Sequence, residues 1–354
     1  MKNKQTTKII IIILIVLVVL LVLNLTLDNY QLRIVNLSGI YVILALSMNL
    51  INGFTGLFSL GHAGFMAIGA YTVALLTMTP EMKVMNFYMK PIASGLANIN
   101  LPFIFALLAA GIMSAVFGFL IGAPVLKLTD DYLAIATLGF SEIIRIVIIN
   151  LQSVTNGALG LKGIPQINFI LLERIFKVST RINLFWTWGI AILTVLFMKF
   201  LMEGSYGKAF KAIREDEIAA RAMGVNLFKH KVMSFTIGSF LAGVGGGLLA
   251  ASLGTIDPTL FKFVLTFNIL LIVVLGGMSN IGGTVVAAII VTVAMEALRF
   301  LDSSMNLGFI VTPALPGLRM VVFSLILIFV IIFKKEDNAL LKAIGKARKK
   351  YARN

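Results

Sequence analysis

The chain alternates between long apolar runs and short polar breaks. Runs of roughly 20 apolar residues recur along it, and this is the length that an α-helix needs to cross a bilayer. The pattern predicts ten crossings, at residues 9–27, 34–52, 57–79, 102–126, 131–151, 184–202, 232–252, 262–276, 283–301 and 316–334. Because glycines interrupt several runs, the count can fall to eight or nine. We therefore expect an all-α integral membrane protein with Gly-broken segments.

Composition supports this class. Only 13% of the 354 residues are charged, whereas soluble domains average about 25%. The weak alternating segments of about 10 residues that mark a β-barrel are absent from the sequence. The chain has no cysteine and only two histidines, His62 and His230, so we predict neither a metal site nor catalytic residues.

The basic residues predict the orientation. They gather at the N-terminus, in the polar insert 203–231 and after Phe333, all on one side of the predicted topology. By the positive-inside rule, this side and both termini face the cytoplasm. The N-terminal apolar run is too long for a signal peptide, so we expect a retained first helix. The net charge of +15 then reflects topology and indicates no nucleic-acid partner.

We expect two domains. Residues 1–334 form a polytopic transmembrane domain that includes the insert, and residues 335–354 form a basic cytoplasmic tail. The tail suits an anionic inner leaflet or, alternatively, a soluble partner.

Two Gly-rich breaks, 52–64 and 276–283, carry no charged residue. Irregular backbone at membrane depth survives only against protein or a wet cavity, and it often borders a transport path. In the first break, Asn52, Ser59 and His62 are therefore candidate translocation residues. The alternative for His62, which the lack of further metal ligands favours, is a structural hydrogen-bonding group that holds the broken helix. A tight turn is the alternative for the second break.

Glu142 and Arg145 are also candidate translocation residues. They lie three positions apart inside the fifth crossing and can pair on one helix face. Ionisable groups within a membrane segment are functional candidates, and an ion pair that only fixes packing is the alternative.

The insert predicts two short helices. Asp216 can cap the second helix, and Gly224 can supply its left-handed stop. One face of that second helix collects Ile218, Ala219, Ala222 and Met223. Because a short helix is not stable alone in water, it needs a docking surface, either on its own membrane domain or on a partner.

The motif "GKAFKAIREDEIAARAMGVN" (207–226) resembles the cytoplasmic coupling loop of ABC importer permeases. The stretches 56–76, 130–146 and 155–165 resemble the longer permease of branched-chain amino acid importers, and the resemblance runs from about residue 35 to 333. It implies a second permease, two ABC ATPase subunits and an external substrate-binding protein in a bacterial cytoplasmic (inner) membrane. ATP and Mg would bind to the partner subunits, and no cofactor would bind to this chain.

The resemblance also supplies candidate ATPase-coupling residues. They are Arg214, Glu215, Asp216, Glu217, Ala219, Ala220, Arg221, Met223 and Gly224. ABC importers often show E-A-A-x-x-x-G here, but Ile218 stands at the glutamate position and Glu217 lies one residue early. On a helix this is a rotation of about 100°.

The expected function is import of leucine, isoleucine and valine, driven by ATP hydrolysis on separate subunits. A related importer for urea or short amides is one alternative, and a stand-alone ion-coupled carrier is another. An intramembrane enzyme ranks last because the chain offers few groups for acid–base or metal chemistry. The Gly-rich stretch 155–165 lacks the G-K-[ST] ending of a phosphate-binding loop, so the chain itself has no ATP-binding motif.

Overall fold

The computed structural model describes residues 18–128, 130–165 and 184–302, together with five residue pairs between 305 and 325. The chain divides into two compact units, Met1–Ile289 and Ile290–Asn354. The predicted all-α class is confirmed: helices dominate, and each described strand is two residues long. The basic tail, most of the first predicted crossing and most of the tenth lie outside the described residues.

Long apolar helices make up most of the first unit. Five described helical segments are long and apolar enough to cross a membrane. They are α2 (Asn29–Met48) with the π-helix η1 (Asn49–Phe54), α6 (Phe103–Val125), α7 (Asp130–Asn150), α10 (Leu184–Glu203) and α13 (Leu227–Leu253). Three apolar helices are shorter: α3 (His62–Thr77), α14 (Phe263–Gly276) and α15 (Ile281–Ala297). These eight helical segments lie at the second to ninth predicted crossings.

The third crossing starts later than the sequence predicts. The expected start was residue 57, but α3 begins at His62. Before it, residues 55–61 are irregular, and their polar groups bond to side chains: the Leu60 N–H donates to Thr137 Oγ1 at 3.0 Å. These side-chain bonds replace the intrahelical bonds that a longer α3 would make. The second Gly-rich break is the tight turn between α14 and α15, in which the Asn280 N–H donates to the Gly277 carbonyl.

The core of the first unit forms where α13 packs against α3 and α6. Small residues on α13 permit this close approach. A Cβ added to Gly243 would lie 2.5 Å from Ser114 Cβ of α6, and one added to Gly246 would overlap the Met66 carbonyl of α3. The glycine-rich face of this helix is therefore a packing surface.

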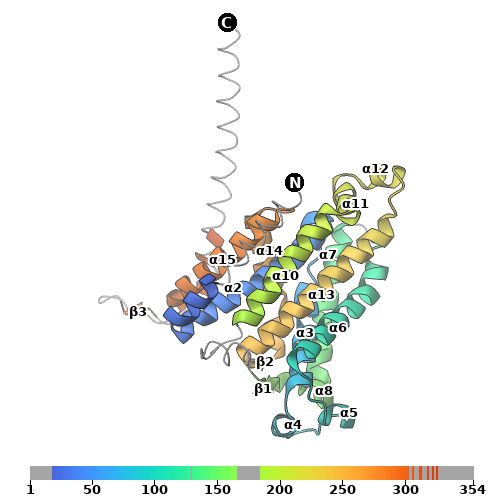
Figure 1. Ribbon diagram of the computed structural model, residues 1–354. Coiled ribbons are helices and arrows are strands. Elements are labelled where there is room, and N and C mark those ends of the chain that lie inside the picture. The colour runs from blue at the N-terminus through green and yellow to red at the C-terminus, as the bar shows by residue number, and fades with distance from the viewer. Residues whose placement is uncertain are drawn as a thin grey trace. The chain divides into compact units, whose positions relative to one another are not determined.

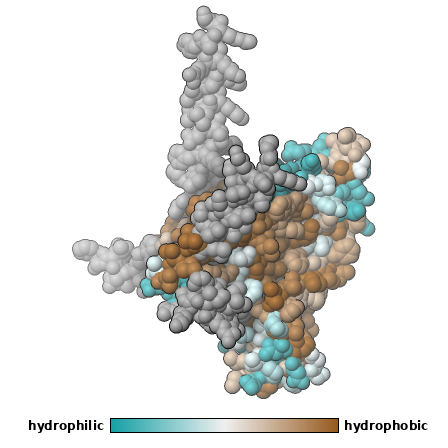
Figure 2. Space-filling model, in the orientation of Figure 1, coloured by the Kyte–Doolittle hydropathy of each residue, from teal (hydrophilic) through white to brown (hydrophobic). Residues whose placement is uncertain are grey.

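Short elements form the two ends of the first unit. One end carries α11 (Ser205–Glu215) and α12 (Glu217–Ala222) (Figure 1). The opposite end carries α4 (Pro80–Asn86), α5 (Ser94–Ala97), α8 (Gln152–Thr155), the 3-10 turns η2 (Gly157–Leu159) and η3 (Pro258–Phe261), and the antiparallel strands β1 (Leu161–Lys162) and β2 (Thr255–Ile256). On the face that Figure 2 shows, apolar residues cover the middle of this unit, and hydrophilic residues gather at these ends.

Lys83 holds the loop at the α4 end together. Its side chain is fully buried, and Nζ donates to the carbonyls of Leu96 at 2.8 Å and Ile99 at 2.5 Å. Burial lowers the pKa of Lys83.

The described part of the second unit is small. It contains the end of α15, the 3-10 turn η4 (Leu298–Asp302) and the antiparallel strands β3 (Met305–Asn306) and β4 (Val311–Thr312). Arg299 pairs with Glu296 at 2.8 Å across one helical turn.

Candidate functional site

The polar insert folds as two helices, as its sequence predicts. Asp216 ends α11 and caps α12: its Oδ1 accepts the N–H groups of Ile218 at 2.8 Å and Ala219 at 3.0 Å. Gly224 has φ +82°, which is the left-handed conformation expected after the helix. Phe210 and Ile213 of α11 are buried and anchor the insert.

One face of α12 is apolar and uncovered. Ile218 is 83% exposed and Met223 is 85% exposed, and Ala219 and Ala222 are also exposed. We call these four residues the α12 face. Large exposed apolar side chains on a short polar helix are typical of a binding surface.

Ala220 does not belong to this face. It is 4% exposed and packs with Ile213 and Leu227 in a small apolar cluster that joins α12 to α11 and α13. The motif therefore places two neighbouring alanines in different environments. Ala219 faces outward, and Ala220 holds the helix in place.

Glu217 and Arg214 attach the insert to the rest of the chain. Glu217 forms an ion pair with Lys231 in the first turns of α13. Glu217 lies one residue before the glutamate position of the family motif, and the sequence does not predict its partner. The structure shows that this partner is Lys231. Arg214 donates to the Ser279 hydroxyl in the turn between α14 and α15 and also lies 3.9 Å from the exposed carboxylate of Glu215.

Asn52, Ser59 and His62 are all buried, in the stretch from the π-helix η1 to the start of α3. Asn52 Nδ2 donates to the Ser59 carbonyl at 3.2 Å, and Asn52 Oδ1 accepts the Ser59 N–H at 3.4 Å. His62 Nε2 lies 2.8 Å from Ser47 Oγ. The Asn52 contacts satisfy backbone groups of the irregular segment, and the His62 contact joins the start of α3 to α2.

Glu142 and Arg145 pair along α7 at 2.7 Å, and both side chains are partly buried. Within the part of the chain that the structure describes, no hydrogen bond or ion pair joins them to Asn52, Ser59 or His62. Hydrogen bonds thus join Asn52 to Ser59 and Glu142 to Arg145, while His62 bonds to Ser47, and the role of these residues in translocation stays a prediction.

The structure also reveals supporting residues that the sequence analysis missed. Ser47 bonds to His62 in the first Gly-rich break, and Asn49 accepts the N–H of Ser279 in the second. Ser279 in turn donates to the Gly53 carbonyl in the first break. Ser47 and Asn49 are polar residues at the end of the apolar run 34–52, and this is the signal that marks them in the sequence. Among the described residues, no group of three or more His, Asp or Glu side chains gathers for a metal ion.

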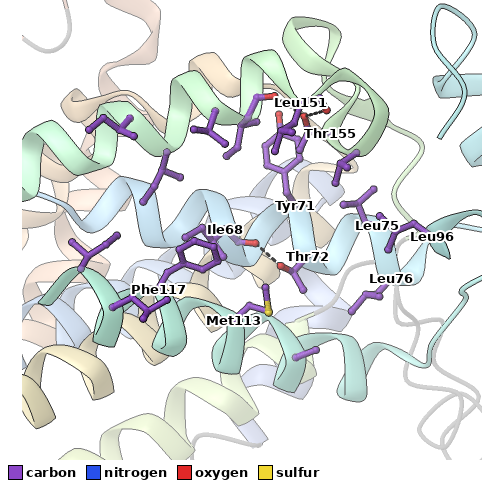
Figure 3. Close-up of a pocket in the computed structure, with 18 of the residues that line it drawn as sticks. Ile68, Tyr71, Thr72, Leu75, Leu76, Leu96, Met113, Phe117, Leu151 and Thr155 are labelled. Carbon is purple, nitrogen blue, oxygen red and sulfur yellow. Dashed lines mark hydrogen bonds between the residues drawn. The ribbon is translucent and has the colours of Figure 1, made fainter. Parts of the chain in front are cut away.

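An apolar cavity of about 820 Å³ lies between α3, α6 and α7 (Figure 3). Its wall includes Ile68, Met113 and Phe117, with Leu151 at the end near α8. The Thr72 hydroxyl in the wall already donates to the Ile68 carbonyl at 2.7 Å. None of the candidate translocation residues lines this cavity.

The apolar helices define a multi-pass membrane protein, and the α12 face lies exposed at one end of its first unit. A family model described as "Branched-chain amino acid transport system / permease component" matches residues 30–331. The chain therefore belongs to this permease family.

Curated relatives agree with this assignment. The chain is 38% identical over 288 residues to the high-affinity branched-chain amino acid transport system permease protein LivM of Salmonella typhimurium. The aligned region makes up 75% of this chain and 63% of that relative. It is 27% identical over 287 residues to a probable LivM of Methanocaldococcus jannaschii, with 74% and 80% covered. It is 25% identical over 272 residues to the permease protein LivH of Salmonella typhimurium, with 75% and 83% covered.

The chain thus spans about 63% of the length of the LivM proteins that it matches at 38% identity. No solved structure matches it.

Proposed function

We propose that this chain is a transmembrane permease subunit of an ABC importer that moves leucine, isoleucine and valine into the cytoplasm. ATP hydrolysis on separate subunits would drive the transport. The observation that carries the proposal is the uncovered α12 face on a polar insert, in a chain of the branched-chain amino acid permease family. The match to both LivM and LivH supports a second permease as a partner.

The complete assembly would contain two permeases, two ABC ATPase subunits that bind ATP and Mg, and an external substrate-binding protein. It would lie in the bacterial cytoplasmic membrane with both termini and the α12 face on the cytoplasmic side. Ile218 and Met223, which are exposed in the isolated chain, would dock on an ATPase. Burial of each side chain there would contribute roughly 1.5–3 kcal/mol to the free energy of binding. The ion pair between Glu217 and Lys231 would hold α12 in position for docking.

Under this proposal, ATP binding closes the two ATPases and moves the docked helices. The permease pair then switches between outward-open and inward-open states. Because α12 is fixed to α11 and α13 through Ala220 and Lys231, it moves with these helices as one body.

The first test is affinity capture of the tagged chain from its native membrane in mild detergent, followed by mass spectrometry. We expect a second permease and ATPase subunits to remain bound. In a Met223→Glu variant, the new charge would be buried at the interface, so we expect the ATPases to be lost and the second permease to be kept.

Met85→Glu is the matched control, since Met85 is 74% exposed on α4 at the opposite end of the unit. It should retain the ATPases. Capture of the chain alone, from a sample that still transports after reconstitution, would replace the importer with a stand-alone carrier.

A further inference from the structure

The two Gly-rich breaks, far apart in the sequence, touch each other through Ser279. Its N–H donates to Asn49 Oδ1 at 2.9 Å, and its hydroxyl donates to the Gly53 carbonyl at 2.7 Å. Asn49 and Gly53 belong to the π-helix η1 at the end of α2, and Ser279 belongs to the turn before α15. The contacts span at least 226 residues of sequence, so only packing creates them.

Asn49 extends this connection to α15. Its Nδ2 group donates to Thr284 Oγ1 at 2.7 Å, and both residues are buried. A Cβ added to Gly53 would lie 2.8 Å from the Ser279 nitrogen, so the approach of the two segments is too close for a side chain there. The end of α2 and the start of α15 are therefore held by one continuous set of hydrogen bonds.

The polar insert is the third partner of Ser279. Arg214 Nη1 of α11 donates to the Ser279 hydroxyl. The aliphatic part of Arg214 also packs on Gly56 of the first break, where an added Cβ would lie 3.0 Å from Arg214 Cγ. One serine hydroxyl thus joins the insert to both breaks.

The backbone of Ser279 indicates that its side chain is needed. Its φ is +65°, and among the described residues only Asn156 shares a positive φ without being glycine. The left-handed conformation costs a residue with a Cβ roughly 1–2 kcal/mol, and glycine avoids this cost. Glycine would fit this turn with less strain, so backbone conformation does not explain why a serine stands here. What the serine adds is its hydroxyl, which bonds to Arg214 and Gly53.

We propose that Ser279 is a positioning residue for transport, which transmits movement of α11 to the π-helical end of α2 and to α15. The inference rests on the proposed function, because α11 moves only if a partner ATPase drives it. π-Helical segments often mark functional sites, and η1 stands where the connection enters the interior. The Ser279 bonds to Arg214 and Gly53 are directional, so a shift of the insert displaces both breaks together.

The test is Ser279→Gly in the complete complex, reconstituted in liposomes with its partner subunits and supplied with radiolabelled leucine. The readouts are leucine transported per ATP hydrolysed and the unfolding temperature. Glycine removes the hydroxyl and relieves the strained φ, so we expect stability to be kept or raised. Transport per ATP should fall about tenfold, which corresponds to ~1.4 kcal/mol of lost coupling.

Asn156→Gly is the matched control. It also replaces a residue of positive φ (+60°) and also removes a side-chain hydrogen bond, to the Gly160 carbonyl, but it lies at the opposite end of the unit. It should transport as the wild type does. Arg214→Ala should lower transport per ATP as Ser279→Gly does, and the double variant should be no worse than either.

The outcomes separate this inference from the proposed function. A wild-type complex without ATP-driven leucine uptake would overturn the proposed function and this inference with it. A wild type that transports, beside a Ser279→Gly variant with unchanged coupling, would overturn the inference alone. A variant whose stability falls together with its transport, or additive losses in the double variant, would also overturn it by showing a merely structural role or two independent roles.

Discussion

At the scale of single residues, buried polar side chains bond to backbone groups that helices leave unpaired. Asn52 bonds to both backbone groups of Ser59, and Lys83 bonds to two carbonyls in the α4–α5 region. An unpaired buried polar group costs about 1–3 kcal/mol, so each of these side chains stabilises an irregular segment. They make it possible for non-helical backbone to lie inside a protein that is otherwise apolar.

Lys83 provides a test at this scale. In Lys83→Met, a side chain of similar length fills the space, but the Leu96 and Ile99 carbonyls lose their donor. We expect the unfolding temperature in detergent to fall by a few degrees. Lys90→Met, at an exposed position of the same loop, should leave it unchanged. Equal unfolding temperatures for the two variants would contradict a structural role for Lys83.

At the scale of elements, the fold depends on close contact of α13 with α3 and α6. Gly69 of α3 and Gly243 of α13 pack so closely that a Cβ on Gly69 would overlap the Gly243 carbonyl. In a membrane, burial of apolar surface does not drive helices together, so this fit of small residues contributes much of the association.

Gly246→Ala tests this packing. The added methyl group would overlap the Met66 carbonyl and force α13 away from α3, and overpacking of this kind costs about 1–3 kcal/mol. Gly189→Ala is the control, because Gly189 of α10 is exposed and has no neighbour within 4 Å of an added Cβ. Thermal unfolding should show a loss for the first variant. The second should gain up to about 1 kcal/mol from helix propensity. A Gly246→Ala variant as stable as the control would show that α13 adjusts without cost.

At the scale of the whole molecule, the chain combines an apolar helical unit with a polar insert whose outer face is uncovered. The apolar cavity between α3, α6 and α7 has no charged residue in its wall, and the described polar clusters lie elsewhere.

The reconstituted complex, with its external binding protein, should accumulate leucine, isoleucine and valine when ATP is present. Uptake of radiolabelled urea should stay at the level of empty liposomes, because a carrier for branched side chains gains from burying apolar surface that urea lacks. A complex without ATP is the control for leakage. ATP-dependent urea uptake without leucine uptake would instead support the related importer for urea or short amides.

The sequence by itself determined the helical class, the approximate positions of eight apolar helical segments and the two helices of the insert. Run length, the Asp216 cap and the Gly224 stop depend on neighbouring residues, so a linear pattern is enough to predict them. The family motif also follows from the sequence alone. The orientation, the domain division and the roles of the candidate residues stay predictions.

Only the tertiary structure decided which side of the insert faces outward and what holds it. Ala219 and Ala220 are neighbours of the same type, and packing on Ile213 and Leu227 buries one and exposes the other. Lys231 became the partner of Glu217, and Ser279 joined two breaks at least 226 residues apart. Such contacts depend on how α2, α11, α13 and α14 pack in space, which no local pattern in the chain encodes.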